Sequence, residues 1–463
     1  MDDLKIYFAT YNVGTSSPEQ SLLEMLSLSS NPKNDKATPD FYVIGLQEVS
    51  AQPVKLMIDA FNDDPWTRAL KEILAPRNYI KLKTIRLQGL VLSVYALRKH
   101  LLNVREIESN YTRTGLSGLW GNKGAVSIRL GIYGCTICFV NAHLSAHDHQ
   151  LDDRIEDYNT IVKDQEFHVS GNNTIFFHDY IFWMGDLNFR LLENFDRSPE
   201  EIERIINKGN IDELFKHDQL RSVMQKKVAF SELDEGNPLF PPTFKFEVGD
   251  SKYDHKRRPA WTDRILYKVH PNNYDNITLH AEQKSYISHP QYTLSDHKPV
   301  TSEFVIKTPQ LTKRLATFTL IDSQVLSEYG EEVVKFDKIS NWWDNEENCI
   351  SFEFLHYHKI NRDDWIGVYK ADFCCLDEYQ TYEYVMKNSS PTPTPKNKVS
   401  PQMSPNSSVQ NPEGFSKKYN ITFSQPSNKH DGLYRLIYVS ETEDKVRSVL
   451  GISDAFTISD KDD

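Results

Sequence analysis

The stretch YIFWMGDLNFRL, residues 180–191, begins as an apolar strand and ends in a carboxylate and an amide two residues apart, Asp186 and Asn188. Taken alone, Gly-Asp-x-Asn is ordinary turn chemistry. Three further apolar runs also end in polar residues: KIYFATYN at Asn12, FYVIGLQE at Gln47 and Glu48, and CTICFVNAH at Asn141 and His143. Side chains two positions apart point to the same side of a strand. Four such endings predict strand ends gathered at one rim of a layered core, where binding and catalytic groups are commonly presented.

Two later segments add charged groups to this inventory. RRPAWTDRILYK places Asp263 and Arg264 at the start of a strand, and LSDHKPV places Asp296 beside His297. Adjacent residues rarely orient one another, so Asp263 is the better partner for His297, although it could equally serve as a structural partner of Arg264. A mixture of Glu, Asp, Asn and His without cysteine suits Mg²⁺ better than zinc.

Length and composition limit the classes of protein to consider. The chain has 463 residues and a mass of 53.7 kDa, which favours two domains. Its formal net charge of −12 argues against a general nucleic-acid binder. The five cysteines show no disulfide spacing, and Cys135 and Cys138 lie in a strand-like run that points them to opposite faces. The N-terminus leads directly into a strand and no apolar run reaches membrane-spanning length, so we expect a cytoplasmic protein.

The pattern of the chain changes in its last third. Residues 1–308 alternate strand-like and helical segments, such as the helix predicted from Ser198 to Gly209, and indicate a layered α/β domain. Residues 312–460 contain short strand-like runs with little helix and predict a small β-sandwich. Within that domain, the Ser/Pro-rich residues 388–413 cannot form a core and are predicted to be a disordered insertion.

Together these motifs resemble the signatures of the inositol polyphosphate 5-phosphatases, members of the endonuclease/exonuclease/phosphatase superfamily. The two main motifs are FWMGDLNFR at 182–190 and RRPAWTDRIL at 257–266. Supporting motifs follow the family order over residues 4–306: TYNVGT, LQEV, GNKGAVSIRL, NAHLSAH and SDHKPV. The C-terminal region resembles the SKICH domain through RDDWIGVYK, DGLYRLIYVS and LGISDAF, although its Ser/Pro-rich insertion departs from the compact pattern of that domain. The resemblance implies a layered β-sandwich flanked by helices, followed by a small all-β immunoglobulin-like domain.

The resemblance also implies roles for the acidic and amide side chains of the rim. Glu48 would be the main Mg²⁺ ligand, with Asn12 close to the ion and Asp296 completing the acidic rim. Asp186 would orient and deprotonate the attacking water, and Asn188 would hold that water or a phosphate oxygen. Taken singly, Asn12 could instead be a strand-end cap, as could Asn141.

The histidines are implied to act on the phosphoryl group. His297, held by Asp263, and His143 would donate hydrogen bonds to the group in transfer, in an in-line displacement by water. The remaining histidines of the SAHDHQ stretch, His147 and His149, are expected with Asp148 in a solvated loop.

The basic residues are candidates for substrate binding, because an inositol ring with several phosphates requires cations. The resemblance places Lys245, in PTFKF, against the 4-phosphate. Further substrate-binding candidates are Arg257, Arg258, Lys123 and Arg264. A solvated basic loop is the alternative for Arg258 and for the neighbouring Lys252 and Lys256.

The GLSGLWG stretch, residues 115–121, has neither helical nor strand periodicity. Leu116, Leu119 and Trp120 could contact lipid beside a headgroup site, and a packed loop tip is an equal alternative. Lipid contact would favour phosphatidylinositol 4,5-bisphosphate and the 3,4,5-trisphosphate over soluble inositol phosphates.

We therefore predict a Mg²⁺-dependent phosphoinositide 5-phosphatase that dampens phosphoinositide signalling. We expect a monomer that associates peripherally with the plasma membrane or endoplasmic reticulum, binds no nucleic acid, and contacts a protein partner through its SKICH-like domain. The alternatives are a DNA-repair-type or sphingomyelinase-type hydrolase on the same fold, and a phosphoinositide-binding scaffold without activity. The 257–266 motif, Lys245 and the complete set of expected catalytic residues argue against these alternatives.

Overall fold

The structure is a computed structural model that describes residues 3–35, 38–50, 63–115, 120–169, 171, 173–271, 278–309, 332–344, 346–355, 358–391, 418–424 and 432–459. The chain divides into two compact units, Met1–Arg98 with Glu106–Thr319, and Lys99–Arg105 with Leu320–Asp463. Within the described ranges, no helix is both long and apolar enough to cross a membrane.

The first unit contains two sheets, and the first sheet has six strands. They are β1 (Asp3–Asn12), β2 (Phe41–Gln47), β3 (Tyr79–Leu87), β4 (Leu90–Leu97), β10 (Ala281–Ser288) and β11 (Val300–Lys307). Their order in the sheet is β10-β11-β1-β2-β4-β3. β1 and β2 are parallel, with Asn12 opposite Gln47, so both strands end at the same edge. The other neighbouring strands of this sheet are antiparallel.

The second sheet repeats this arrangement. Its strands in this unit are β5 (Val104–Gly115), β6 (Trp120–Ile132), β7 (Cys135–His143), β8 (Tyr180–Asp186) and β9 (Asp263–Val269), in that order across the sheet. β7 and β8 are parallel, with His143 opposite Asp186. β9 runs antiparallel to β8 and begins at Asp263, directly opposite Asp186.

The alternation of side chains along each strand fills two different cores. Phe8 of β1 points to the second sheet, where its ring centroid lies 4.5 Å from that of Phe182 on β8. Tyr11 of the same strand points the opposite way and meets Trp66 of helix α1 (Pro65–Leu74), with 5.8 Å between the ring centroids. The two sheets therefore pack on each other, and each outer face is available to helices.

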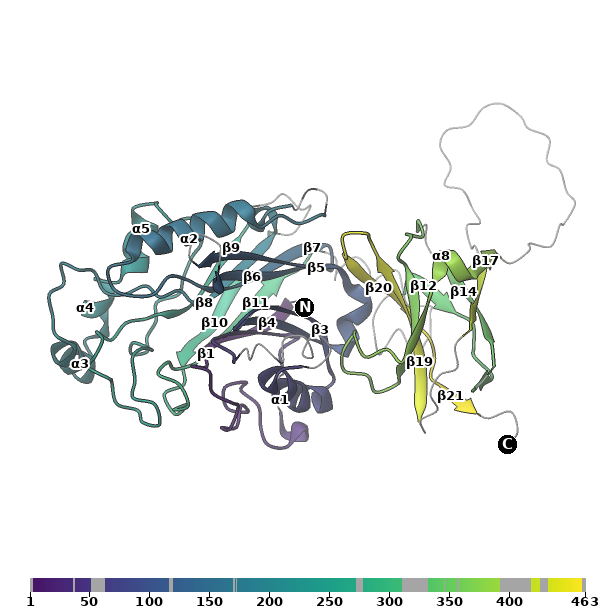
Figure 1. Ribbon diagram of the computed structural model, residues 1–463, viewed down its shortest axis with the longest axis horizontal. Helices are drawn as coiled ribbons and strands as arrows, with labels where there is room; N and C mark the ends of the chain where they lie inside the picture. Colours follow the sequence, from purple (N-terminus) through teal and green to yellow (C-terminus); the bar gives the residue numbers. More distant parts are fainter. Residues whose placement is uncertain are drawn as a thin grey trace, which may run out of the picture. The chain divides into compact units, whose positions relative to one another are not determined.

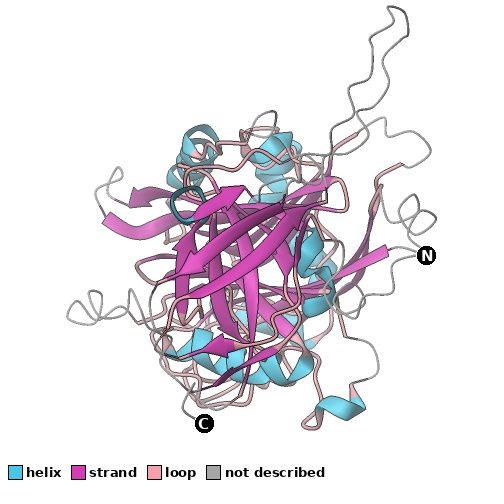
Figure 2. Cartoon of the chain, turned by 90° about the vertical axis from the view of Figure 1, so that its right-hand side faces the viewer, coloured by secondary structure: helices cyan, strands magenta, loops and turns pink. Residues whose placement is uncertain are grey.

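The helices cover those outer faces. α1 packs on the first sheet, while α2 (Leu151–Asp164) and α5 (Gln219–Gln225) pack on the second, where Tyr158 of α2 lies 5.3 Å from the Trp183 ring. In Figure 1, α2 and α5 lie on one side of the strands and α1 on the other. In Figure 2 the strands form the interior and most helices lie outside them. The sandwich flanked by helices agrees with the predicted fold class.

Within the described part of this unit, two further α-helices follow β8. They are α3 (Pro199–Asn207) and α4 (Ile211–Phe215). α3 corresponds to the predicted helix: Ser198 and Glu201 form a capping box, and Gly209 follows with φ of +76°, a conformation that suits glycine. Cys135 and Cys138 are buried and free, and burial raises the pKa of both thiols, which fits neither a redox pair nor a metal site.

The second unit is an all-β sandwich, as the sequence predicts. One sheet has the order β12-β14-β18-β17, and the other contains β13, β21, β19 and β20 together with β15 and β16. The bounds are β12 (Val334–Phe336), β13 (Trp342–Trp343), β14 (Asn348–Phe354), β15 (Trp365–Lys370), β16 (Thr381–Tyr384), β17 (Ser389–Pro391), β18 (Lys418–Phe423), β19 (Leu433–Glu441), β20 (Arg447–Ile452) and β21 (Phe456–Ser459). Aromatic rings join the two sheets, for example Phe352 and Tyr438 with centroids 5.7 Å apart.

The predicted disordered insertion begins too early in the sequence. Residues 388–391 close the short helix α8 (Val385–Asn388) and form β17, in which Ser389 lies opposite Ile421 of β18. The Ser-Ser-Pro composition suggested a linker, but the backbone pairing with β18 gives these residues a place in the sheet. Residues 392–413 lie outside the described residues.

Candidate active site

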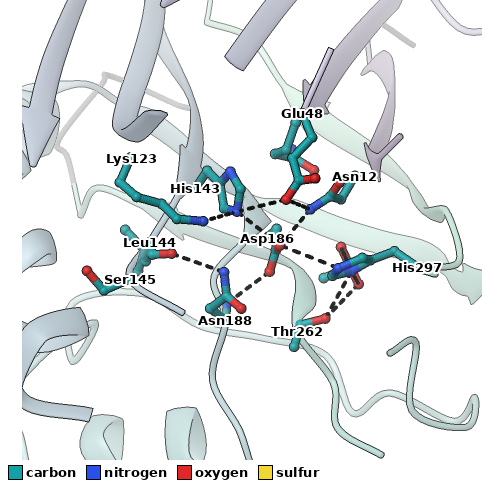
Figure 3. Close-up of polar contacts among 12 residues, drawn as sticks. Asn12, Glu48, Lys123, His143, Leu144, Ser145, Asp186, Asn188, Thr262 and His297 are labelled. Atoms are coloured by element: carbon teal, nitrogen blue, oxygen red, sulfur yellow. Dashed lines mark hydrogen bonds and ion pairs between the residues drawn. The ribbon is translucent and has the colours of Figure 1, made fainter. Parts of the chain in front are cut away.

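Four strand ends converge because each sheet contributes one parallel pair. Asn12 ends β1 and Glu48 follows β2, while His143 and Asp186 end β7 and β8. Figure 3 shows the side chains of these residues pointing toward one another. Asp263 joins them because the antiparallel β9 begins where β8 ends. The rim expected from the four polar strand endings is therefore a single cluster drawn from both sheets.

Asp186 is the centre of this cluster. Its Oδ2 accepts a hydrogen bond from Asn12 Nδ2 at 2.9 Å and lies 3.3 Å from His143 Nε2 and 3.7 Å from His297 Nε2. Its Oδ1 accepts from the Asn188 backbone N–H at 3.1 Å. Burial alone would raise the pKa of Asp186, but the charge of His297 and the neighbouring His143 and Lys123 outweigh burial and hold this pKa far below its usual range. Asp186 is therefore a carboxylate at every physiological pH.

His297 is oriented by Asp263. The distance from His297 Nδ1 to Asp263 Oδ2 is 2.9 Å, and the hydroxyls of Thr243 and Thr262 donate to the same carboxylate oxygen at 2.7 and 2.9 Å. Burial lowers the pKa of His297, but Asp263 and Asp186 more than compensate and raise it to about 9. The imidazole is therefore a cation at neutral pH, with Nε2 directed toward Asp186 (Figure 3).

Glu48 is the most accessible carboxylate of the cluster, with 44% of its side chain exposed. Asn12 donates one amide hydrogen to Glu48 Oε1 at 3.1 Å and another to Asp186, and so holds the two carboxylates side by side. The Asn12 oxygen is turned away and accepts from the Gly14 N–H at 3.0 Å. Glu48 has φ of +56°, which an ordinary side chain adopts at a cost of about 1–2 kcal/mol and which is common at functional sites.

These groups fit a divalent cation better at Glu48 than deeper in the cluster. Ligand atoms of Asp186, Asp263 and His297 do lie within 4.8 Å of one another. However, His297 carries its own positive charge, and both Asp263 oxygens contact His297 Nδ1. An exposed carboxylate beside an ionised Asp186 is the donor set that hard cations prefer.

Lys123 and His143 form a second pair at the rim. Lys123 Nζ is hydrogen-bonded to His143 Nε2, and the ring also lies 3.9 Å from Glu48. Burial and the nearby Lys123 charge lower the pKa of His143, so this imidazole is neutral while His297 is charged. The two histidines around Asp186 are thus in opposite charge states.

Lys245 and Asp296 lie at the open side of the cluster. Lys245 Nζ contacts Asp296 Oδ2 at 2.5 Å, and about a quarter of each side chain is exposed. The charges of His297 and Lys245 outweigh burial and lower the pKa of Asp296. Arg257, twelve residues after Lys245 in the sequence, is exposed. Its Nη1 donates a long hydrogen bond of 3.4 Å to the Lys256 carbonyl.

Two predicted substrate-binding residues have structural partners instead. Arg264 does not line the rim, and its predicted role in substrate binding is wrong: the side chain is fully buried and paired with Asp218 at 3.0 Å and with Glu235. Arg258 donates to main-chain carbonyls, including those of Leu191 at 2.9 Å and Phe195 at 3.0 Å. Both guanidiniums hold loops together.

The SAHDHQ loop agrees with its predicted setting, whereas the 115–121 stretch cannot be placed. His147 and His149 are exposed, and Asp148 between them is partly exposed, with its Oδ2 accepting from Arg258 Nε at 3.2 Å. Leu116 and Leu119 lie outside the described residues. Trp120 begins β6, but its side chain is also outside the described part of the chain.

Some residues support the site without facing it, and three of them, Thr243, Thr262 and Arg190, were not among the predicted site residues. Gln47 and Asn141 are buried and join the sheets through a 2.7 Å bond from Gln47 Nε2 to Asn141 Oδ1, so they brace the rim instead of facing it. Thr243 and Thr262 fix Asp263, and Arg190 fixes Asn188. All three lie in motifs that the sequence analysis quotes and could have been suspected from position: Arg190 in 182–190, Thr243 in PTFKF and Thr262 in 257–266.

Profiles of two known families match the chain. The Endonuclease/Exonuclease/phosphatase family 2 matches residues 9–303, and the SKICH domain matches residues 334–458. Inositol polyphosphate 5-phosphatase K of Mus musculus is 33% identical over 401 residues, covering 83% of this chain and 80% of that protein. Phosphatidylinositol 4,5-bisphosphate 5-phosphatase A of the same species is 36% identical over 388 residues, which are 82% of this chain but only 36% of that protein. The chain thus matches about a third of the length of this second relative.

Solved structures support the same fold. The inositol polyphosphate 5-phosphatase domain of SPsynaptojanin, determined with inositol (1,4)-bisphosphate and a calcium ion, has a TM-score of 0.56 and 31% identity, covering 68% of this chain and 88% of that one. A nitrophorin of Cimex has a TM-score of 0.53 at 24% identity and covers 66% of this chain and 99% of that one. The nitrophorin indicates the fold alone.

Proposed function

The chain belongs to the inositol polyphosphate 5-phosphatases, within the endonuclease/exonuclease/phosphatase superfamily, and on this premise we propose that it removes the 5-phosphate from phosphatidylinositol 4,5-bisphosphate and 3,4,5-trisphosphate in a Mg²⁺-dependent reaction. The observation that carries the proposal is the cluster around Asp186, in which Asn12, His143 and His297 converge on one carboxylate. A membrane-lipid substrate is supported by the relatives named for phosphatidylinositol 4,5-bisphosphate.

Asp186 positions the attacking water. Because its pKa is held far below the usual range, this carboxylate is a weak base, and its main contribution is to accept a hydrogen bond that aims the water oxygen at phosphorus. The new P–O bond forms in line with the P–O ester bond that breaks; overall, one proton of the attacking water ends on the departing inositol 5-oxygen and the other stays on the inorganic phosphate. Asn188, bonded to Asp186 through its backbone, lies where its amide could hold the same water or a phosphoryl oxygen.

His297 stabilises the charge that develops on the phosphoryl oxygens. A buried imidazolium fixed by Asp263 needs little reorganisation during the reaction, and a preorganised donor of this kind is typically worth about 10²–10³ in rate. His143, neutral and bonded to Lys123, offers a second contact from another side. Lys123 would thereby contribute positive charge next to the substrate.

Glu48, with Asn12 beside it and Asp296 on the open side, would hold the Mg²⁺ ion. When bound, the ion would offset negative charge on the phosphate oxygens. Lys245, partly exposed and opposite Asp296, is the candidate for the 4-phosphate, and the exposed Arg257 would extend this basic side. A substrate phosphate would compete with Asp296 for the Lys245 ammonium.

The proposal also covers the oligomeric state, the membrane association and the partners of the enzyme. We propose a monomer that associates peripherally with the plasma membrane or endoplasmic reticulum, with Leu116, Leu119 and Trp120 in contact with lipid. The SKICH-like second unit would bind a protein partner. The expected exclusion of nucleic acid is supported by the net charge of −12.

The test is phosphate release from vesicles that contain phosphatidylinositol 4,5-bisphosphate or the 3,4,5-trisphosphate, with Mg²⁺ or with EDTA. We expect release only with Mg²⁺, and we expect Asp186→Asn to abolish it. Asp196→Asn, which alters an exposed aspartate away from the cluster, is the control and should be active. Release from soluble inositol phosphates alone would reject the lipid substrates. No release from any of these substrates, with intact vesicle binding, would favour the scaffold alternative.

A further inference from the structure

The side-chain amide of Asn188 has one defined orientation. Its Nδ2 donates one hydrogen to the Leu144 carbonyl at 3.0 Å, and its Oδ1 accepts from Arg190 Nη2 at 2.5 Å. Its backbone N–H donates to Asp186 Oδ1 (Figure 3), and its φ of +56° is the left-handed conformation that asparagine tolerates better than most residues. With Oδ1 turned to Arg190, the second Nδ2 hydrogen is left for another acceptor.

Arg190 is bound to Asn188 at two points. Its Nε donates to the Asn188 backbone carbonyl at 3.0 Å, while Nη2 donates to the side-chain oxygen. The planar guanidinium thus spans the backbone and side chain of one residue, which a lysine ammonium cannot reproduce in the same geometry. The guanidinium also stacks on the Phe244 ring, with 4.3 Å between Cζ and the ring centroid.

The charge of Arg190 is buried without a carboxylate partner among the described residues. The residue is 4% exposed, yet within the described ranges it makes no ion pair with a carboxylate, and its Nη1 is buried without a hydrogen-bond partner. Buried arginines are normally paired, because removing the charge from water is costly. Arg264 follows that rule, since it is paired with both Asp218 and Glu235. Arg154 is also buried and, within the described ranges, also lacks a carboxylate partner, so what distinguishes Arg190 is its double contact with Asn188.

We propose that Arg190 is a positioning residue that locks the Asn188 amide with its nitrogen toward the reacting groups, so that the free Nδ2 hydrogen can donate to the attacking water or a phosphoryl oxygen. This inference rests on the proposed phosphatase function. In the flipped amide, Oδ1 would face the anionic phosphoryl oxygens and repel them, and it would lose the charged donor of Arg190. Arg190 acts through Asn188 and does not itself reach the substrate.

The test is a double-mutant cycle on the full chain, with dioctanoyl phosphatidylinositol 4,5-bisphosphate and Mg²⁺. We expect Arg190→Lys to lower kcat by about 10–100-fold, the effect of one lost charge-assisted hydrogen bond, with KM nearly unchanged. In an Asn188→Ala background, where no amide remains to be oriented, Arg190→Lys should change kcat less than about 3-fold. Arg190→Gln keeps a planar donor but not the charge. Its kcat should lie between the kcat of the wild type and that of Arg190→Lys.

Arg154→Lys is the matched control. Arg154 is also buried over an aromatic ring, Phe189 at 5.6 Å, and also donates to main-chain carbonyls, but it does not contact Asn188. Arg154→Lys should change kcat by the same factor in the wild type and in the Asn188→Ala background. Full additivity of Arg190→Lys with Asn188→Ala, or a higher KM at unchanged kcat, would overturn the positioning role. An inactive wild type would instead reject the proposed function together with the inference drawn from it.

Discussion

Asp263→Asn isolates the electrostatic role of the His297–Asp263 pair. The substitution keeps the size of the side chain and removes the charge that lies 2.9 Å from His297 Nδ1. Thr243 and Thr262 already donate to this position and can rotate to accommodate an amide. The variant should therefore fold with His297 in place but without its principal source of positive-charge stabilisation.

The magnitude follows from the pKa of His297. Its rise from an ordinary 6.5 to about 9 corresponds to about 3 kcal/mol in favour of the imidazolium, against burial, which lowers the pKa. Without Asp263, burial remains and only Asp186 and Asp296 oppose it, so we expect the pKa of His297 to fall well below that of the wild type. Where the variant ring is fully neutral and the wild-type ring is still charged, kcat should be lower by about 10²–10³, the usual effect of losing one preorganised charged donor.

The pH profile gives the sharper measurement. Wild-type kcat/KM for short-chain phosphatidylinositol 4,5-bisphosphate should decline as pH rises through about 9, and the decline in Asp263→Asn should move at least one pH unit lower. The free energy of unfolding should also decrease as pH rises. The raised pKa of His297 in the folded state contributes stability that is complete below about pH 6.5 and is lost as pH rises through about 9. The melting temperature of the wild type should therefore fall more steeply than that of the variant across this interval.

The control for this prediction is Asp218→Asn, which removes another buried aspartate, paired with Arg264 away from the rim. It should lower stability without moving the alkaline limb of activity. An alkaline limb that stays near pH 9 in Asp263→Asn, or that moves equally in Asp218→Asn, would refute the assignment of this limb to His297.

Three further variants test other parts of the site. Glu48→Gln should raise the Mg²⁺ concentration for half-maximal activity by at least about 10-fold, because a neutral amide is a poorer ligand, and a Mg²⁺ titration of phosphate release measures this. Lys245→Met should raise KM for phosphatidylinositol 4,5-bisphosphate by about 10-fold at little cost in kcat, and an inositol phosphate that lacks the 4-phosphate should show no such effect. Arg264→Met should lower the free energy of unfolding, measured in urea, by about 3–5 kcal/mol, because Asp218 and Glu235 lose their shared cation. The KM of the folded variant should be unchanged.

The gathering of the rim could be predicted from the sequence because strand periodicity is local. A polar residue after an apolar run identifies the end of the strand, as for Asp186, the last residue of β8. The structure adds the reason why the four ends coincide: Asn12 lies opposite Gln47 and His143 opposite Asp186 in two parallel pairs, one in each sheet. Parallel pairing cannot be read from the runs themselves.

Asp263 was predicted as the partner of His297, 34 residues away, but other partners that are distant in the chain were not. Arg264 lies in a basic motif next to Asp263, and composition alone made it a candidate for phosphate binding, but its partners are Asp218 and Glu235, 46 and 29 residues away. Gln47 has the same strand-end position as the catalytic candidates, yet its side chain is buried against Asn141. Residue type and strand phase do not distinguish a side chain that faces the rim from one that braces the interface of the two sheets behind it.

The charges at the rim give a physical reason for a divalent ion that does not depend on ligand type. Four carboxylates face four cationic side chains there: Glu48, Asp186, Asp263 and Asp296, against Lys123, Arg190, Lys245 and His297. This set is formally neutral before substrate enters, and a phosphate monoester adds a charge of about −1.5 to −2. Because an unbalanced charge in a largely buried site is costly, a cation of charge +2 at the exposed Glu48 would restore neutrality where the phosphate would bind. Burial lowers the pKa of Lys123, which would weaken the attraction between this cation and a dianion and so add to the role of the metal.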